Sequence, residues 1–302
     1  MIISKYQNND QLLIQPLVSV LITAFNREKH IAESIESVLQ STYTNFELII
    51  VDDCSVDDTF KIASSFLLKD KRIKIFKNNL NLGQFGNRNK AIHLANGEYI
   101  KFLDSDDKLM PNGLKTMVNA MLAYPKAGLG VQCPKDNTIE MPCELISHES
   151  IILHYRGVNH LCYGPTGVIF KKEALYKVDL FEESYGILAD TLLNIKVASV
   201  YSTVFFDRNL YFWRQHTDQV TTQQKDDVRM INERNIIMLA SMSYKYLPLN
   251  KQEINKILNN FVKINTVHFF KYFFKGQLKN AFKIQNDTDL TIKKMFLAFF
   301  KH

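Results

Sequence analysis

The chain has 302 residues, of which 46% are hydrophobic and 23% charged, and its formal net charge is +6. This composition is ordinary for a globular protein with one large or two modest domains and excludes a largely disordered chain. Its four cysteines form no CxxC pair and no zinc-ligand spacing with histidine, and no apolar run is long enough to span a bilayer. The first ten residues lack the basic region and apolar core of a signal peptide. We therefore expect a cytoplasmic protein with reduced thiols.

The positive charge is concentrated at one end of the chain. Residues 251–302 contain ten lysines and three acidic residues, a balance of +7, which leaves 6 − 7 = −1 for the first 250 residues. A nucleic-acid-binding protein more often places basic residues beside aromatic or helix-turn-helix elements of its main fold, and the sequence has no such signature. We expect no nucleic acid partner.

Short apolar runs alternate with amphipathic segments in the first half of the chain. In chain order we expect a strand at 17–24, a helix at 31–39, strands at 46–51 and 73–76, a helix at 87–95, a strand at 98–103 and a helix at 111–122. Ser55 and Asp58 resemble a capping box that begins a further helix after the second strand. Strands separated by helices predict a mainly parallel, doubly wound sheet with helices on both faces.

Two of these strands end in acidic turns. Asp52 and Asp53 follow the second strand, and residues 104–107, Asp-Ser-Asp-Asp, follow the fourth. Open α/β sheets hold their ligands at the carboxyl ends of parallel strands. Three acids in four residues repel one another unless a cation compensates them, and oxygen ligands suit Mg²⁺ or Mn²⁺ that bridges to substrate phosphates. A loop whose acids only cap the next helix is the alternative.

Nucleotide-binding signatures of other α/β proteins are missing. The turn after the first strand reads Thr23-Ala24-Phe25-Asn26-Arg27 and contains no GxGxxG, and no GxxxxGKS/T occurs anywhere. These absences disfavour a dinucleotide-dependent dehydrogenase and a P-loop NTPase. A sugar nucleotidyltransferase would need a glycine-rich basic loop near its N-terminus, which is also absent.

Six segments resemble, in order, the motifs of family 2 glycosyltransferases. They are residues 18–26, 34–39, 47–59, 81–83, 88–92 and 97–107. The resemblance implies a GT-A fold of the nucleotide-diphospho-sugar transferase type, a nucleotide-sugar donor, a divalent metal and inversion at the anomeric carbon. We expect an N-terminal tail at 1–16, a catalytic domain at 17–220 with a nucleotide-sugar half (17–115) and an acceptor half (116–220), and a helical, basic region at 221–302.

The resemblance also implies which residues hold the metal. Asp106 corresponds to the last acid of the family's DxD motif and is the expected metal ligand, while Asp104 is expected at the ribose or in the water shell of the metal. Asp107 is expected only to cap or orient. Arg214-Gln215-His216 is similar to the family's closing Arg-x-His segment, so His216 is a second candidate metal ligand, with a solvated loop histidine as the alternative.

Three further residues are candidates for nucleotide binding. Asp53 resembles the acid that accepts a hydrogen bond from the imide N–H of uracil, which favours a UDP-sugar, and helix capping is the alternative. Thr23 ends the adjoining strand where the base is expected. Arg88 is expected either to contact the base or phosphates or to be a charge on a helix surface.

An acceptor hydroxyl needs a base, and a carboxylate is the usual one. Residues 181–190 resemble a family segment that ends in Glu-Asp, in which Ala189 replaces the Glu and Asp190 remains. Asp190 is the expected general base, and a helix N-terminus there is expected to lower its pKa. A simple N-cap is the alternative.

The acceptor side is less defined by the sequence. His160 and Thr166 fall where related enzymes form the floor of the acceptor site. Trp213, the single tryptophan, is expected either to stack on a sugar or to fill the core. Residues 134–149 read as a polar insertion that forms a mobile acceptor-side loop.

The C-terminal third reads as helical and basic. Lys271, Lys275, Lys279 and Lys283 recur at four-residue steps opposite a phenylalanine-rich face, and Gly276 interrupts the pattern. A helix of this kind can lie on the inner face of the plasma membrane. A helix packed on the catalytic domain or a homodimer helix is the alternative, and the apolar residues of 295–302 favour some membrane or partner contact.

Two functions follow from these observations. The first is an inverting hexosyl- or N-acetylhexosaminyl-transferase that extends a cell-surface glycan or a lipid-linked acceptor. The second is a non-catalytic protein of the same fold that binds a nucleotide-sugar or glycan and acts in assembly. The complete acidic set of Asp53, Asp104, Asp106 and Asp190 favours the first.

Overall fold

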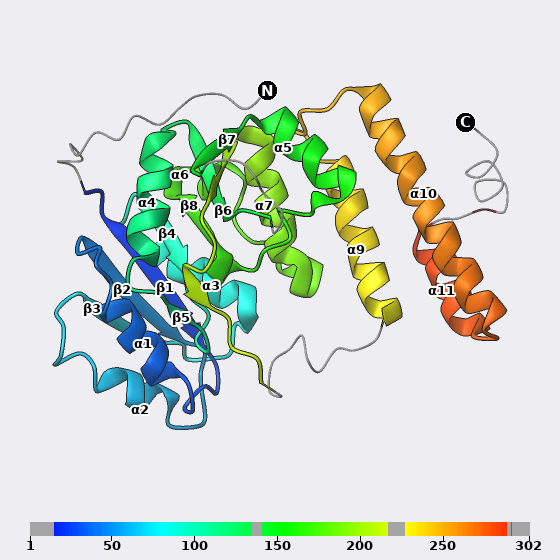
Figure 1. Ribbon diagram of the computed structural model, residues 1–302. Helices are drawn as coiled ribbons and strands as arrows, with labels where there is room; N and C mark the ends of the chain where they lie inside the picture. The colour runs from blue at the N-terminus through cyan, green and yellow to red at the C-terminus, as the bar shows by residue number, and fades with distance from the viewer. Residues whose placement is uncertain (1–14, 135–140, 217–226, 289–290, 292–302) are drawn as a thin grey trace. The chain divides into compact units, whose positions relative to one another are not determined.

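The computed structural model describes residues 15–134, 141–216, 227–288 and 291. The chain forms two compact units, which are described separately below (Figure 1). Unit 1 comprises residues 1–184 and 189–215, and unit 2 comprises residues 185–188 and 216–302.

Unit 1 contains the strands and most of the helices. Its strands are β1 (Val18–Ala24), β2 (Phe46–Asp52), β3 (Ile73–Lys77), β4 (Tyr99–Phe102), β5 (Lys108–Leu109), β6 (Ala127–Gln132), β7 (Cys143–Leu145), β8 (Val168–Lys171), β9 (Ser202–Phe206) and β10 (Tyr211–Phe212). Its α-helices are α1 (Ile31–Leu39), α2 (Thr59–Ser64), α3 (Gly83–Leu94), α4 (Gly113–Ala123), α5 (Ser147–Leu153), α6 (Lys172–Lys177) and α7 (Ala189–Val200), and a 3₁₀ turn, η2 (Pro165–Gly167), precedes β8.

The main sheet has the strand order β3-β2-β1-β4-β8-β6-β9-β7. The strands β3, β2, β1 and β4 are mutually parallel, β8 runs antiparallel to β4 and β6, and β7 runs antiparallel to β9. A second, two-stranded sheet pairs β10 with β5. The predicted mainly parallel α/β sheet is therefore confirmed, with two antiparallel strands in its second half.

The sheet is parallel at its centre because its strands are apolar on both faces. Every residue of β2 is buried, and so is every residue of β1 except Thr23. Val20 of β1 packs in one cluster with Ile35 of α1 and Met117 of α4, whereas α3 packs against β1 and β2. Strands covered in this way need mainly apolar and β-branched sequence, which these two strands have, and the buried Ser19 and Glu47 satisfy each other by a hydrogen bond of 2.6 Å.

Three local expectations were wrong. The helix after β2 does not begin with a capping box at Ser55, because the Ser55 hydroxyl accepts the N–H of Asn26 and Asp57 instead accepts the N–H of Thr59. Helix α3 begins at Gly83, four residues before the expected start. The expected loop 134–149 contains β7, which pairs with β9, while residues 135–140 lie outside the described chain.

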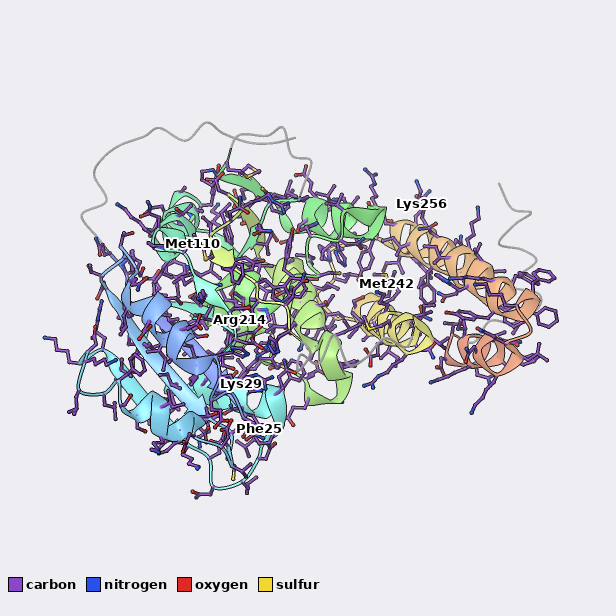
Figure 2. The ribbon with its side chains drawn as sticks, turned by 60° about the horizontal axis from the view of Figure 1, so that its bottom comes forward. Phe25, Lys29, Met110, Arg214, Met242 and Lys256 are labelled. Carbon is purple, nitrogen blue, oxygen red and sulfur yellow. The ribbon has the colours of Figure 1, made fainter. Side chains whose placement is uncertain are left out.

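Unit 2 is helical in its described residues. It contains α9 (Asp227–Met242), α10 (Lys251–Phe274) and α11 (Leu278–Asp287), and Figure 2 marks Met242 at the end of α9 and Lys256 near the start of α10. Asn250 and Glu253 form a capping box at the start of α10. The small core of this unit is formed by Val228, Phe269, Tyr272, Ala281 and Ile284.

A tight turn at Gly276 separates α10 from α11. Gly276 has a φ of +71°, its N–H donates to the carbonyl of Phe273, and the N–H of Gln277 donates to the carbonyl of Tyr272. This is the Schellman arrangement that ends helices at a left-handed glycine. The lysine stripe of the sequence therefore spans two helices of a hairpin. No helix in the described parts of the chain is long and apolar enough to cross a membrane.

Candidate active site

The two acidic turns lie at one edge of the sheet. Strand β1 pairs in parallel with both β2 and β4, so the carboxyl ends of these strands lie together. Hydrogen bonds from the N–H of Asp53 to the carbonyl of Ala24 and from the N–H of Leu103 to the carbonyl of Leu21 hold both turns to β1. The expected common edge of Asp53 and residues 104–107 is confirmed.

Arg88 joins the two sides of this edge. It projects from α3, is only 3% exposed, and donates from Nη1 to Asp190 Oδ1 at 2.7 Å and from Nη2 to Asp104 Oδ1 at 2.9 Å. Burial disfavours the charge of the guanidinium, but the two carboxylates outweigh it and raise the pKa of Arg88. Arg88 is therefore a buried bridge between two acids and not the helix-surface charge that the sequence left open.

Asp190 lies in the first turn of α7, and its side chain is 14% exposed. Burial raises the pKa of Asp190 to about 6, an effect that Asp104 reinforces and that Arg88 opposes. The expectation that the helix N-terminus lowers this pKa was wrong, because desolvation of the carboxylate outweighs it. At neutral pH Asp190 is ionised and more basic than an ordinary aspartate.

Helix α3 also fixes the segment that leads to Asp190. The side chain of Asn89 donates to the carbonyl of Phe181 at 3.0 Å and accepts the N–H of the same residue at 3.1 Å. The guanidinium of Arg88 lies 5.8 Å from the centre of the Phe181 ring. A Cβ on Gly86 would stand 2.9 Å from Glu183 Oε1, so glycine permits this close approach.

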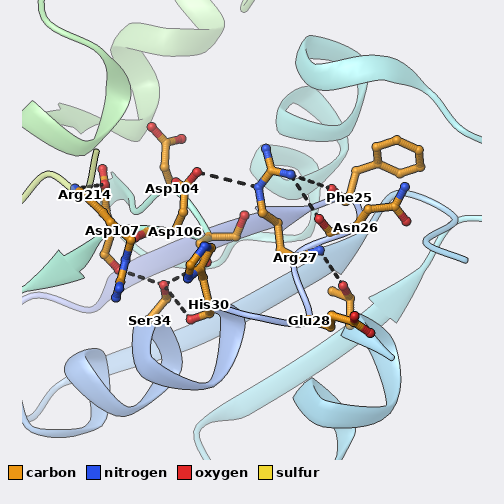
Figure 3. A network of polar contacts seen from close by, with 12 residues as sticks. Phe25, Asn26, Arg27, Glu28, His30, Ser34, Asp104, Asp106, Asp107 and Arg214 are labelled. Atoms are coloured by element: carbon orange, nitrogen blue, oxygen red, sulfur yellow. Dashed lines mark hydrogen bonds and ion pairs between the residues drawn. The ribbon is translucent and has the colours of Figure 1, made fainter. Parts of the chain in front are cut away.

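Arg214 and Ser34 hold residues 104–107, the acidic loop, in place (Figure 3). The Nε of Arg214 donates to the carbonyl of Asp106 at 2.9 Å, and its backbone N–H donates to Asp107 Oδ1 at 3.0 Å. The hydroxyl of Ser34, on α1, lies 2.7 Å from the carbonyl oxygen of Asp107. These contacts fix the backbone of the loop at the carboxyl edge of the sheet.

Glu33 connects the same loop to α1. It accepts hydrogen bonds from Lys108 and, at 2.8 Å, from Arg214 Nη2. The hydrogen bond from Lys108, followed by that from Arg214, lowers the pKa of Glu33 to about 2. The carboxylate therefore stays ionised over the whole physiological range and keeps Arg214 in place.

Arg27 is a site residue that the sequence analysis missed. Its Nε lies 3.6 Å from Asp106 Oδ2, and its Nη1 donates to the carbonyls of Phe25 and Asn26 (Figure 3). The sequence could have identified Arg27 by its position in the turn after β1, at the carboxyl edge of the sheet. It places a positive charge beside the candidate metal ligand.

Lys101 was also missed, because the sequence gives no sign of the partners that a lysine inside an apolar strand finds. It is fully buried, and its Nζ donates to the carbonyls of Thr166 and Val168. Burial lowers the pKa of Lys101 to about 7, and the nearby Asp104 and Asp107 oppose this shift. Burial of the Asp107 carboxylate, reinforced by the charge of Asp104, raises the pKa of Asp107 to about 7.

Thr166 supports the loop from η2. Its hydroxyl accepts the N–H of Asp104 at 3.0 Å, and its side chain is buried. The structure thus brings Thr166 to the acidic loop, where it holds the backbone. Its expected contact with an acceptor stays a prediction.

The acidic loop fits a divalent metal in part. In the described residues, no group of three or more His, Cys, Asp or Glu side chains could hold a metal ion. Asp104 and Asp106 still offer carboxylate oxygens from one loop, and Mg²⁺ and Mn²⁺ accept such ligands while taking the others from water and substrate phosphates. His216 belongs to unit 2, so its role as a ligand stays a prediction.

Asp53 and Thr23 lie where the sequence placed them. Asp53 is buried, and its Oδ1 accepts hydrogen bonds from Asn78 Nδ2 at 2.7 Å and from the N–H of Leu82 at 2.8 Å. Thr23 is half-buried in β1 and pairs with Val51. Their contacts with a nucleotide stay predictions.

His160 and Trp213 have opposite environments. His160 is fully buried, contacts the Ser150 hydroxyl at 3.0 Å through Nε2, and stacks edge-on with Phe205. Burial lowers the pKa of His160 to about 3, so it is a neutral core histidine, and this argues against its expected contact with an acceptor. Trp213 is 53% exposed, which excludes the core alternative and leaves it accessible to a sugar.

Comparison with known proteins agrees with this geometry. The family described as glycosyl transferase family 2 matches residues 19–184. Over 105 residues the chain is 44% identical to the UDP-Glc:alpha-D-GlcNAc-diphosphoundecaprenol beta-1,3-glucosyltransferase WfaP of Escherichia coli. That match covers 35% of this chain and 41% of the relative, so the chain spans less than half of the relative's length.

Solved structures resemble the chain over most of its length. S. aureus TarS 1-349 in complex with UDP-GlcNAc has a TM-score of 0.67 at 20% identity and covers 93% of this chain and 81% of its own. The mannosyltransferase PcManGT from Pyrobaculum calidifontis, in complex with GDP-Man and Mn²⁺, has a TM-score of 0.65 at 15% identity, with coverages of 94% and 79%. These likenesses confirm the expected GT-A type of fold. Because the family match spans more than half of the 302 residues, the chain belongs to glycosyl transferase family 2.

Proposed function

We propose that the chain is an inverting glycosyltransferase that moves a sugar from a UDP-sugar to a hydroxyl of a lipid-linked or glycan acceptor in bacterial cell-surface polysaccharide synthesis. The observation that carries this proposal is the buried bridge in which Arg88 joins Asp104, on the donor side, to Asp190. The name of the E. coli relative supports both a UDP-sugar donor and a lipid-linked acceptor.

Asp190 acts as the general base in this proposal. An alcohol is a poor nucleophile at neutral pH, and a carboxylate within hydrogen-bond reach removes its proton as the new bond forms. Asp190 takes that proton, the acceptor oxygen attacks the anomeric carbon, and the nucleoside diphosphate leaves from the opposite face, which inverts the configuration. The pKa of about 6 suits this task, because the group is ionised at pH 7 yet more basic than an exposed aspartate.

The donor occupies the carboxyl edge of β1, β2 and β4. Asp53 accepts the imide N–H of uracil beside Thr23, and Asp104 contacts the ribose or the hydration shell of the metal. Asp106 would hold Mn²⁺ or Mg²⁺ at this edge, while a role of His216 as a second ligand stays a prediction. When bound, the ion stabilises the charge of the departing diphosphate. Arg27 adds a fixed positive charge beside Asp106.

Metal-dependent hydrolysis of UDP-sugars, with water in place of the acceptor, tests this function. The full chain is expected to release UDP in the presence of Mn²⁺, and Asp106→Ala is expected to lose this release while it still unfolds cooperatively in a thermal scan. Asp58→Ala is the matched control, because Asp58 is an exposed carboxylate that makes no side-chain capping bond.

Two outcomes would contradict the proposal. If Asp106→Ala kept its response to Mn²⁺, the metal assignment would be wrong. If the wild-type chain were stabilised by UDP-sugars but released no UDP, with or without an acceptor, the non-catalytic nucleotide-sugar-binding or glycan-binding protein would be favoured, since bound ligand alone raises the unfolding temperature.

A further inference from the structure

The hairpin of α10 and α11 carries a group of exposed apolar side chains. Its members, which we call the hairpin face, are between 38% and 80% exposed: Phe270, Phe273, Phe274, Leu278 and Phe282. The rings of Phe270 and Phe274 stack with their centroids 5.7 Å apart. The ring centroid of Phe282, on α11, lies 6.1 Å from that of Phe269, on α10. Exposed apolar clusters of this kind mark surfaces that bind another protein, a membrane or a ligand.

The two helices that carry the hairpin face are positively charged. Lys271, Lys275, Lys279 and Lys283 are all exposed on the same two helices. Between Glu253 and Asp287 the sequence contains six lysines and no acidic residue. Neither helix therefore supplies a carboxylate along this stretch to neutralise the lysines locally.

We propose that the hairpin face docks on an anionic phospholipid surface. Apolar rings that enter the headgroup boundary and lysines that meet anionic headgroups are the two contributions that hold an interfacial amphipathic helix. A second copy of the chain fits this face poorly, because a two-fold contact would place lysines against lysines. The docking deepens the proposed function and rests on it for its purpose, since a lipid-linked acceptor lies in a membrane.

Vesicle flotation of the full chain tests the charge contribution. The wild type is expected to float with vesicles that contain phosphatidylglycerol, and much less with phosphatidylcholine alone or at high salt. The triple variant Lys275→Glu, Lys279→Glu and Lys283→Glu is expected to partition about a hundredfold less, since each lysine contributes about 1 kcal/mol and about 1.4 kcal/mol is tenfold. The control is Lys71→Glu, Lys115→Glu and Lys126→Glu, three exposed lysines of unit 1, which changes the net charge equally and is expected to float like the wild type.

Two variants, one on the hairpin face and one control, test the apolar contribution to flotation. Phe274→Ser is expected to weaken flotation about tenfold, because a fully buried large apolar side chain contributes roughly 1.5–3 kcal/mol. Leu68→Ser alters a 98% exposed leucine of unit 1 and is expected to change nothing.

Three results would overturn the proposal. They are equal flotation with neutral and anionic vesicles, equal losses in the two lysine triples, and a wild-type dimer in solution that the Phe274→Ser variant dissociates. The binding readout needs no catalysis, so a chain that floats but transfers no sugar contradicts only the proposed function, and one that transfers without floating contradicts only the docking.

Discussion

The edge of the main sheet and the hairpin face use charge in opposite ways. At the edge, the side chain of Arg88 is buried and pairs at hydrogen-bonding distance with Asp190, whose side chain is only 14% exposed. On the hairpin face, all four lysines are exposed to solvent. Burial fixes the geometry of a charge and shifts its pKa, which suits chemistry on one bond. A solvated lysine keeps its rotamer freedom and contributes mainly a field, which suits a surface without fixed geometry.

The largest expected effect is at the buried edge. Asp190→Asn removes the proposed base while keeping the size of the side chain, and transfer is expected to fall by about 10²–10⁴-fold. UDP-sugar binding, measured by calorimetry, is expected to persist. Near-wild-type transfer by this variant would show that Asp190 is not the base, and Asp58→Asn serves as the surface control.

Arg88 gives the direct comparison between a buried and an exposed cation. Arg88→Gln leaves Asp190 and Asp104 without their partner, and loss of one member of a buried ion pair costs about 3–5 kcal/mol. We expect the lower end, about 3 kcal/mol in urea unfolding, because the Asp104 side chain is 36% exposed.

Arg229 in unit 2 is the matched control for this prediction. It is half-exposed and pairs with Glu233 at 2.9 Å on α9. Arg229→Gln is expected to cost less than about 1 kcal/mol, as exposed pairs do. Equal costs for the two variants would mean that the Arg88 bridge is not a buried ion pair in solution.

The pH dependence of transfer sharpens the same contrast. Because burial raises the pKa of Asp190 to about 6, the base is ionised above this pH and becomes protonated as the pH falls through it. The value of kcat/KM is therefore expected to decline about tenfold for each pH unit below 6. Arg88→Gln removes the cation that opposes the rise in the pKa of Asp190. The pH below which kcat/KM declines is therefore expected to be higher in this variant. A profile that is flat from pH 5 to 8 would be incompatible with Asp190 as the base.

The smallest expected effect concerns the turn of the hairpin. A Cβ at Gly276 would meet no atom within 4 Å, so Gly276→Ala introduces only the conformational cost of a left-handed residue. This cost is about 1–2 kcal/mol and is measurable as a lower thermal unfolding temperature of unit 2. Gln277→Ala, at the next position, is the control, and an unchanged unfolding temperature in Gly276→Ala would show that the turn relaxes.

Local patterns explain why much of the sheet edge could be predicted. The strands β1, β2 and β4 are short apolar runs, and parallel strands bring the turns that follow them to one side. The strands β7 and β8 were not expected, because β7 has only three residues and the apolar run of β8 gives no sign of its antiparallel pairing with β4 and β6. The capping box at Ser55 failed because an N–H from a distant turn, that of Asn26, occupies the hydroxyl.

The sequence by itself determined the parallel half of the sheet, the acidic turns at its carboxyl edge, the helical C-terminal region and the family resemblance. These depend on composition and on spacing within a few residues. Only the tertiary structure decided that Arg88 lies between Asp104 and Asp190, that Lys101 is buried under the acidic loop, and that His160 is a core residue. Arg88 and Asp190 are 102 positions apart, and their pairing and burial arise only when α3, β4 and α7 pack together. Desolvation, which sets the pKa of Asp190, belongs to that packing and has no local signal in the sequence.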